Sequence, residues 1–169
     1  MRSFISLIVL SVVLAGSQGY GAAVESWQLR SPSVPVVDIS GVTHGGSVYV
    51  AVGQYGLTLT SADGVTWTNA NSGLSNNLHG VAYGNSTFVA VGDDGFAATA
   101  PDGVIWTAHD TGISGHFSNV RFINSQFVAV GSDGLVATSA NGVTWILRST
   151  GISTTLEDVT YGDGQYVAV

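Results

Sequence analysis

The tripeptide Val-Ala-Val recurs four times along the chain, and each copy begins 39 residues after the one before. No insertion breaks this register. A strict period between about 20 and 50 residues is typical of folds in which repeated units stack or form a ring. The copies begin at Val50, Val89, Val128 and Val167, and tryptophans keep the same step at Trp67, Trp106 and Trp145.

The unit that spans residues 78–116 contains four short strand patterns. Residues 78–84 carry Val81 and Tyr83 at alternate positions, which indicates a strand. Residues 87–92 form an apolar run, which is typical of a strand covered on both faces. Residues 96–100 and 104–110 supply two more strands, with turn residues between them. Four antiparallel strands in about 40 residues predict an all-β fold, a β-propeller with one four-stranded blade per unit.

The repeat register also predicts the boundaries within the chain. We expect an outer strand and linker in residues 24–38, because "SWQLRS" resembles "TWILRS" in a later unit. The fourth unit contains only the first two strand patterns, so we expect this chain to be part of a longer product. The predicted blades span residues 39–77, 78–116 and 117–155, and residues 156–169 form the first half of a fourth.

A motif recurs in the third turn of each complete unit, as "SADGVTW", "APDGVIW" and "SANGVTW". Asp and Asn side chains accept hydrogen bonds from turn amides, and glycine adopts a positive φ that other residues avoid. The tryptophan then folds over the turn and buries a large apolar area. We therefore expect a structural role for Ser61, Asp63, Gly64, Trp67, Asp102, Gly103, Trp106, Ser139, Asn141, Gly142 and Trp145.

This motif resembles the Asp-box of bacterial neuraminidase repeats, usually written Ser-x-Asp-x-Gly-x-x-Trp. Here it is one residue shorter between Asp and Gly, and Ala100 and Asn141 depart from it further. The resemblance covers residues 26–169 and implies an Asp-box propeller, most similar to unassigned secreted bacterial repeat proteins. That superfamily includes sialidases, sortilin-type receptors and a photosystem II assembly factor, so the resemblance implies the fold and leaves the function open.

The N-terminal segment has the pattern of a secretory signal peptide. Arg2 precedes an apolar run from residue 4 to residue 15, and small residues follow as far as Ala23. The run is too short to span a bilayer, so we expect cleavage after residues 1–23 and no transmembrane span afterwards. The sequence thus predicts a secreted, periplasmic or cell-surface protein.

The charge of the chain argues against two classes of partner. The formal net charge is −7, lysine is absent, and lysine and arginine together number 4. Nucleic acids and anionic membranes both attract clustered basic residues, so we expect neither as a partner.

The residues of a sialidase site are not gathered in this sequence. Such enzymes, which the resemblance suggests, hold the substrate carboxylate with an arginine cluster and use paired acid and nucleophile groups. Of the candidates Arg30, Arg121 and Arg148, the first and last fall on predicted outer strands. We assign no catalytic residue. A sialidase-like glycoside hydrolase with its residues in a further C-terminal part stays an alternative.

Metal and nucleophile patterns are also missing from the sequence. The histidines occupy four different repeat positions without metal-ligand spacing, and the Asp-Gly pairs are typical of hairpin turns. The chain has no cysteine and no Gly-x-Ser-x-Gly motif. We therefore predict no metal site and no cofactor. The histidines are His44, His79, His109 and His116.

One strand position differs between units that are otherwise alike. It carries Ser40, His79, Ser118 and Glu157 in turn, next to linkers that share a Ser/Thr-Gly-Leu/Ile-Ser core. In a propeller these segments gather around the mouth of the central channel. A repeated framework with a variable rim predicts a scaffold that binds a protein or a glycan, although a purely structural array also fits. The candidate ligand rim is His79, His116, Arg121 and Glu157.

Overall fold

The computed structural model describes residues 9–11, 28–30 and 37–169. The predicted signal peptide (1–23) and linker (24–38) lie largely outside these residues. Within them the structure describes strands β1 (Val9–Ser11) and β2 (Gln28–Arg30), which pair antiparallel. Among the described residues, no helix has the length and apolar character needed to cross a membrane.

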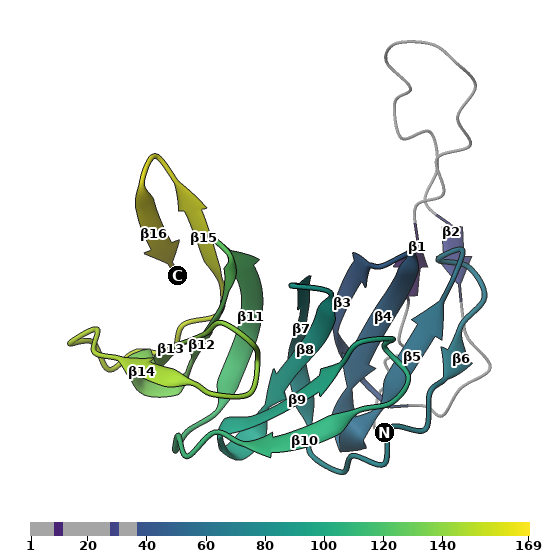
Figure 1. The fold of residues 1–169 in the computed structure, drawn as a ribbon, viewed down its shortest axis with the longest axis horizontal. Helices are drawn as coiled ribbons and strands as arrows, with labels where there is room; N and C mark the ends of the chain where they lie inside the picture. Colours follow the sequence, from purple (N-terminus) through teal and green to yellow (C-terminus); the bar gives the residue numbers. More distant parts are fainter. Residues whose placement is uncertain (1–8, 12–27, 31–36) are drawn as a thin grey trace, which may run out of the picture.

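Three four-stranded antiparallel sheets and one two-stranded sheet follow, arranged side by side along an open arc (Figure 1). Each complete unit of the repeat forms one sheet, in which neighbouring strands are consecutive in the chain. The first sheet contains β3 (Ile39–Gly45), β4 (Val48–Gly53), β5 (Thr58–Ser61) and β6 (Thr68–Asn69). The second contains β7 (Leu78–Gly84), β8 (Thr87–Gly92), β9 (Phe96–Ala100) and β10 (Thr107–Asp110). The third contains β11 (Phe117–Ile123), β12 (Gln126–Gly131), β13 (Val136–Ser139) and β14 (Ile146–Arg148), and the fourth β15 (Val159–Gly162) and β16 (Gln165–Ala168).

The strand boundaries of the second unit match the sequence patterns for its first three strands. The fourth strand begins at Thr107 instead of residue 104. The backbone N–H groups of Val104 and Ile105 each donate to Asp102 Oδ1 at 2.9 Å. These two residues therefore complete the preceding turn and cannot join the strand ladder.

Short 3-10 turns connect the second and third strands of each blade, namely η1 (Gln54–Gly56), η2 (Asp93–Gly95) and η3 (Ser132–Gly134). The last residue of each turn is a glycine with positive φ, which is 66° at Gly95. A Cβ atom on Gly95 would lie 1.8 Å from the Ile113 carbonyl oxygen. The glycine is required because the next linker passes directly over it.

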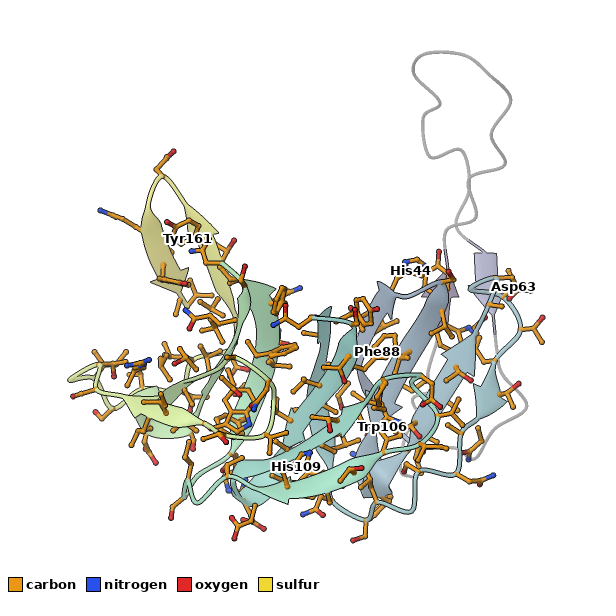
Figure 2. All side chains as sticks on the ribbon, viewed as in Figure 1. His44, Asp63, Phe88, Trp106, His109 and Tyr161 are labelled. Carbon is orange, nitrogen blue, oxygen red and sulfur yellow. The ribbon has the colours of Figure 1, made fainter. Side chains whose placement is uncertain are left out.

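The apolar core lies between the sheets. Val50 and Val52 of β4 pack against Phe88 of β8 and against Trp106, so this cluster joins the first two blades (Figure 2). An equivalent cluster joins the second and third blades around Val89, Val91, Phe127 and Trp145. The middle strands β4, β8 and β12 carry the Val-Ala-Val repeat and are buried on both faces.

Candidate functional site

The first strand of each complete blade contains a β-bulge close to its start. The strand pairing skips one residue in each case, which is Ser40 in β3, His79 in β7 and Ser118 in β11. A bulge leaves the extra residue unpaired and re-aims its side chain. The strand position that varies between units is therefore the bulged position.

The bulged residues line a shallow pocket at one end of the inner strands, which we call the mouth pocket. Its volume is about 290 Å³. Four units of the repeat contribute to it, because the inner strands lie side by side. It brings together three of the four predicted rim residues, His79, His116 and Glu157. The lining consists of Ser40, His79, His116, Phe117, Ser118 and Glu157.

Two histidines of the mouth pocket share one carboxylate. His79 Nε2 lies 2.6 Å from Asp93 Oδ1, and His116 Nδ1 lies 3.2 Å from the same oxygen. Asn77 Nδ2 donates to the other oxygen of Asp93 at 2.9 Å. His79 and Asp93 are half-buried, whereas the His116 side chain is 58% exposed. Asp93 thus joins the second blade to the segment that enters the third.

The pKa of Asp93 is set by opposing effects. Partial burial of the carboxyl raises the pKa, but hydrogen bonds from His79 and Asn77, the charge of His79 and the hydrogen bond from His116 together outweigh it. The net result is a pKa below the usual value for aspartate. Asp93 is therefore a stable anion that can accept hydrogen bonds from both imidazoles.

Only the second unit places a carboxylate at this position. The equivalent residue is Gln54 in the first unit, where its Nε2 donates to Asp38 Oδ2, and Ser132 in the third, where its Oγ accepts the His116 backbone N–H. Asp93 was not among the predicted rim residues, because an Asp-Asp-Gly sequence is typical of a turn. The available signal was that Asp93 is the one acidic residue at this repeat position.

Arg121, the fourth predicted rim residue, is engaged elsewhere. Its Nε donates to Asp158 Oδ1 at 2.9 Å and its Nη2 to Asp158 Oδ2 at 2.7 Å. The hydrogen bonds of this bidentate pair are the main cause of two shifts: the pKa of Arg121 is raised and the pKa of Asp158 is lowered. Arg121 is not among the residues that line the mouth pocket. It joins β11 to the fourth unit instead.

The other basic and histidine side chains lie apart from the mouth pocket. Arg148 Nε donates to Thr138 Oγ1 at 3.0 Å, His44 stacks against Tyr49, and His109 Nε2 lies 2.9 Å from Thr99 Oγ1. Within the described ranges, no three His, Asp or Glu side chains are placed to hold a metal ion. The side chain of Arg30 lies outside the described residues.

The third turns have the geometry that their sequence motif suggests. Asp63 Oδ1 accepts hydrogen bonds from the N–H groups of Val65 and Thr66 at 2.8 and 2.7 Å, and these bonds lower the pKa of Asp63 to about 2. Asn141 Oδ1 accepts the equivalent pair at 2.9 and 3.0 Å. An amide oxygen therefore replaces the carboxylate in this turn without loss of either bond.

The tryptophans that follow these turns differ in environment. Trp106 and Trp145 are each 8% exposed, and each indole N–H donates at 3.0 Å to the carbonyl of its turn glycine, Gly103 or Gly142. This burial confirms that these two side chains are parts of the core. Trp67 is only half-buried, and its Nε1 has no hydrogen-bond partner among the described residues.

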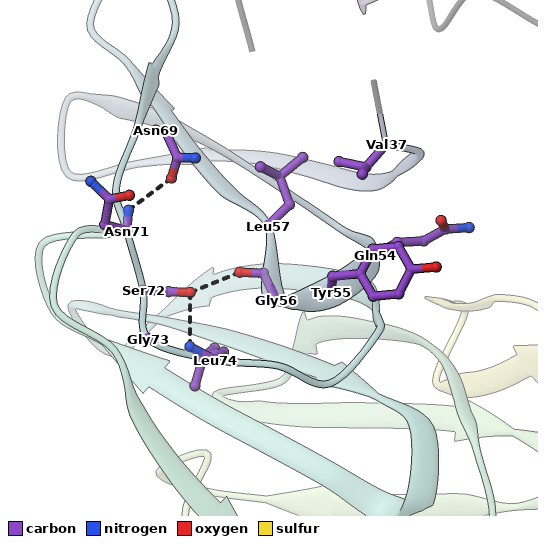
Figure 3. A pocket seen from close by; sticks show the side chains of 10 residues that line it. All are labelled: Val37, Gln54, Tyr55, Gly56, Leu57, Asn69, Asn71, Ser72, Gly73 and Leu74. Atoms are coloured by element: carbon purple, nitrogen blue, oxygen red, sulfur yellow. Dashed lines mark hydrogen bonds between the residues drawn. The ribbon is translucent and has the colours of Figure 1, made fainter. Parts of the chain in front are cut away.

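A second pocket of about 450 Å³ lies beside the first blade (Figure 3). Ser72 Oγ donates to the Gly56 carbonyl at 2.7 Å. The same bond recurs from Thr111 to Gly95 and from Thr150 to Gly134. This wall is therefore part of the repeated framework, and no predicted rim residue lies in it. The lining residues are Val37, Gln54, Tyr55, Gly56, Leu57, Asn69, Asn71, Ser72, Gly73 and Leu74.

Comparison with solved structures identifies the architecture. YCF48 bound to D1 peptide superposes with a TM-score of 0.64 at 17% identity, over 79% of this chain and 48% of that one. The fold is a β-propeller. YCF48 from Cyanidioschyzon merolae gives a TM-score of 0.60 at 19% identity, over 78% of this chain and 49% of that one.

The WD40 β-propeller domain of Doa1 gives a TM-score of 0.56 at 14% identity, over 78% of this chain and 48% of that one. This propeller chain therefore spans about half the length of the solved propellers it matches. No protein-family model and no curated protein sequence matches it.

Proposed function

We propose that this chain is a secreted, non-catalytic propeller scaffold of the Asp-box type that binds a segment of another protein through the mouth pocket. The observation that carries this proposal is the composition of the pocket wall. Ser40, His79, Ser118 and Glu157 occupy one repeat position, and all four line the same pocket. The units therefore differ in chemistry at a position where their side chains converge.

The framework around the pocket supports the same interpretation. The Val-Ala-Val strands of the three complete blades, β4, β8 and β12, are buried and repeated, so they hold the bulged residues in fixed positions. A rigid scaffold that presents a variable surface is a common basis of specific recognition. YCF48, a propeller of similar fold, was solved bound to D1 peptide. We extend peptide binding to this chain as a proposal and locate it at the mouth pocket.

Secretion rests on the signal-peptide pattern of residues 1–23. Expression of the full chain with its native N-terminus tests this part. Export and a mature N-terminus near residue 24 are expected. Retention of Met1 on a protein that stays inside the cell would contradict it.

The binding site is tested by filling the mouth pocket in the full chain. Ser118→Trp places the largest side chain on the pocket wall and should abolish capture of peptides from a displayed peptide library. Ala62→Trp is the matched control, because Ala62 is exposed on the third turn of the first blade. Thermal unfolding of both variants checks that each one folds.

Two results would replace this proposal with another. Equal peptide capture by Ser118→Trp and the parent protein would show that the mouth pocket is not the site. Release of sugar from sialosides or other glycosides by the parent protein would favour the glycoside hydrolase alternative. A glycan array measured in parallel distinguishes a glycan ligand from a protein ligand.

A further inference from the structure

We infer that the mouth pocket recognises a cationic group of its partner, a lysine or arginine side chain or an N-terminal ammonium. This inference rests on the proposed function. The inference adds to the proposed function the chemical class of the bound group. The residues that would recognise the cation are His79, His116 and Glu157 in the pocket wall and Asp93 behind the two histidines.

Glu157 supplies an unpaired negative charge. The residue is exposed and lines the mouth pocket. Its backbone is fixed, because its N–H donates to the Val169 carbonyl at 2.6 Å. Among the contacts of the described residues, the Glu157 carboxylate has no hydrogen-bond or ion-pair partner. A cationic ligand would form an ion pair with this carboxylate.

The two histidines add further acceptors when they are neutral. A carboxylate can only accept, so the ring nitrogens that face Asp93 carry the protons, Nε2 in His79 and Nδ1 in His116. The other nitrogen of each neutral ring then has a free lone pair. The hydroxyl groups of Ser40 and Ser118 in the same pocket can also accept. An ammonium or guanidinium group, which only donates, complements this set.

No basic side chain in the described part of the chain competes for these acceptors. The chain has no lysine, and Arg121 is held by both oxygens of Asp158. The net charge of −7 adds a field that attracts cations. Since no three ligand side chains in the described residues converge on one point, an organic cation fits better than a metal ion.

The test uses three peptides that differ at one position, which is lysine, acetyl-lysine or glutamate. Their binding to the full chain is measured by fluorescence anisotropy at neutral pH. We expect the lysine peptide to bind about twofold to fivefold more tightly than the acetyl-lysine peptide, the range for one exposed charge pair.

Two variants assign the effect to the mouth pocket. Glu157→Gln keeps the shape of the side chain and should remove most of the lysine preference. Asp163→Asn removes one negative charge in the β15–β16 turn, where the equivalent residues are Asn85 and Asn124, and should leave the preference unchanged. In the parent protein, the ring signals of His79 and His116 should shift in NMR spectra when the lysine peptide is added.

The outcomes separate this inference from the proposed function. Peptide binding that Ser118→Trp abolishes, but that is equal for lysine and acetyl-lysine or stronger for glutamate, would overturn the cation inference and keep the proposed function. A lysine preference that survives in Glu157→Gln would also overturn it. Absence of binding by any peptide, in the series or in the library, would contradict the proposed function itself.

Discussion

Substitution of Gly103 by alanine tests how the third turn joins neighbouring blades. Gly103 has a φ of +73°, and a Cβ atom there would lie 2.6 Å from Cγ2 of Val50, which belongs to the preceding blade. Gly64, the equivalent residue in the first blade, has a φ of +70°. Its nearest neighbour would be Cε2 of Tyr49, at an ordinary contact distance of 3.5 Å. The two glycines share a backbone conformation but differ in crowding.

The expected losses of stability follow from that difference. Both substitutions add a Cβ atom to a residue whose backbone is in the left-handed conformation, which costs about 1–2 kcal/mol. Only Gly103→Ala also forces a Cβ atom against Val50, a stiff β-branched residue that is fully buried. Overpacking of this kind costs about 1–3 kcal/mol. We therefore expect Gly64→Ala to lower the free energy of unfolding by about 1–2 kcal/mol and Gly103→Ala by about 2–5 kcal/mol.

Denaturation of the full chain in urea measures both losses. The double variant Gly103→Ala with Val50→Ala provides the room that the new methyl group needs. The cost of Gly103→Ala should therefore be about 1–2 kcal/mol smaller in the Val50→Ala background than in the parent protein. Equal losses at Gly64 and Gly103, or no change in cost when Val50 is truncated, would refute the inter-blade contact.

Two other predictions concern the same turns. Trp106→Phe should lower the free energy of unfolding by about 1 kcal/mol more than Trp67→Phe, because only Trp106 loses a hydrogen bond, the one to the Gly103 carbonyl. Urea denaturation of the two variants compares them, and an equal loss would show that the bond is not stabilising. The pKa of Asp63 lies at about 2, below its usual value, so its contribution to stability is present above about pH 4 and is lost as the pH falls toward 2. Asp63→Asn keeps the acceptor oxygen without a titrating group, as Asn141 does. The thermal unfolding of this variant should depend less on pH in this range. An unchanged pH dependence would contradict the assignment of this effect to Asp63.

The sequence alone determined the architecture, because a propeller blade is built from contacts between neighbouring strands. Apolar patterns and turn residues that recur every 39 residues set the strands, the tight turns and the equivalence of Ser40, His79, Ser118 and Glu157. Such signals are local, since each hairpin is specified by residues a few positions apart. The start of β10 at Thr107 differs from the prediction because the side chain of Asp102 takes two N–H groups away from the strand ladder.

The tertiary structure decided which of these residues meet. Asp93 lies 14 residues from His79 and 23 from His116, and no local pattern links the three before the strands and the linker of the second unit pack together. Arg121 matched the rim by sequence position, but Asp158, which lies 37 residues away, accepts hydrogen bonds from its Nε and Nη2. Ser40, His79 and Ser118 line one pocket because each lies at a β-bulge, and these bulges are set by the register between paired strands. Contacts between blades depend on how separate sheets pack, and the sequence periodicity specifies the sheets without specifying the side-chain pairs that form between them.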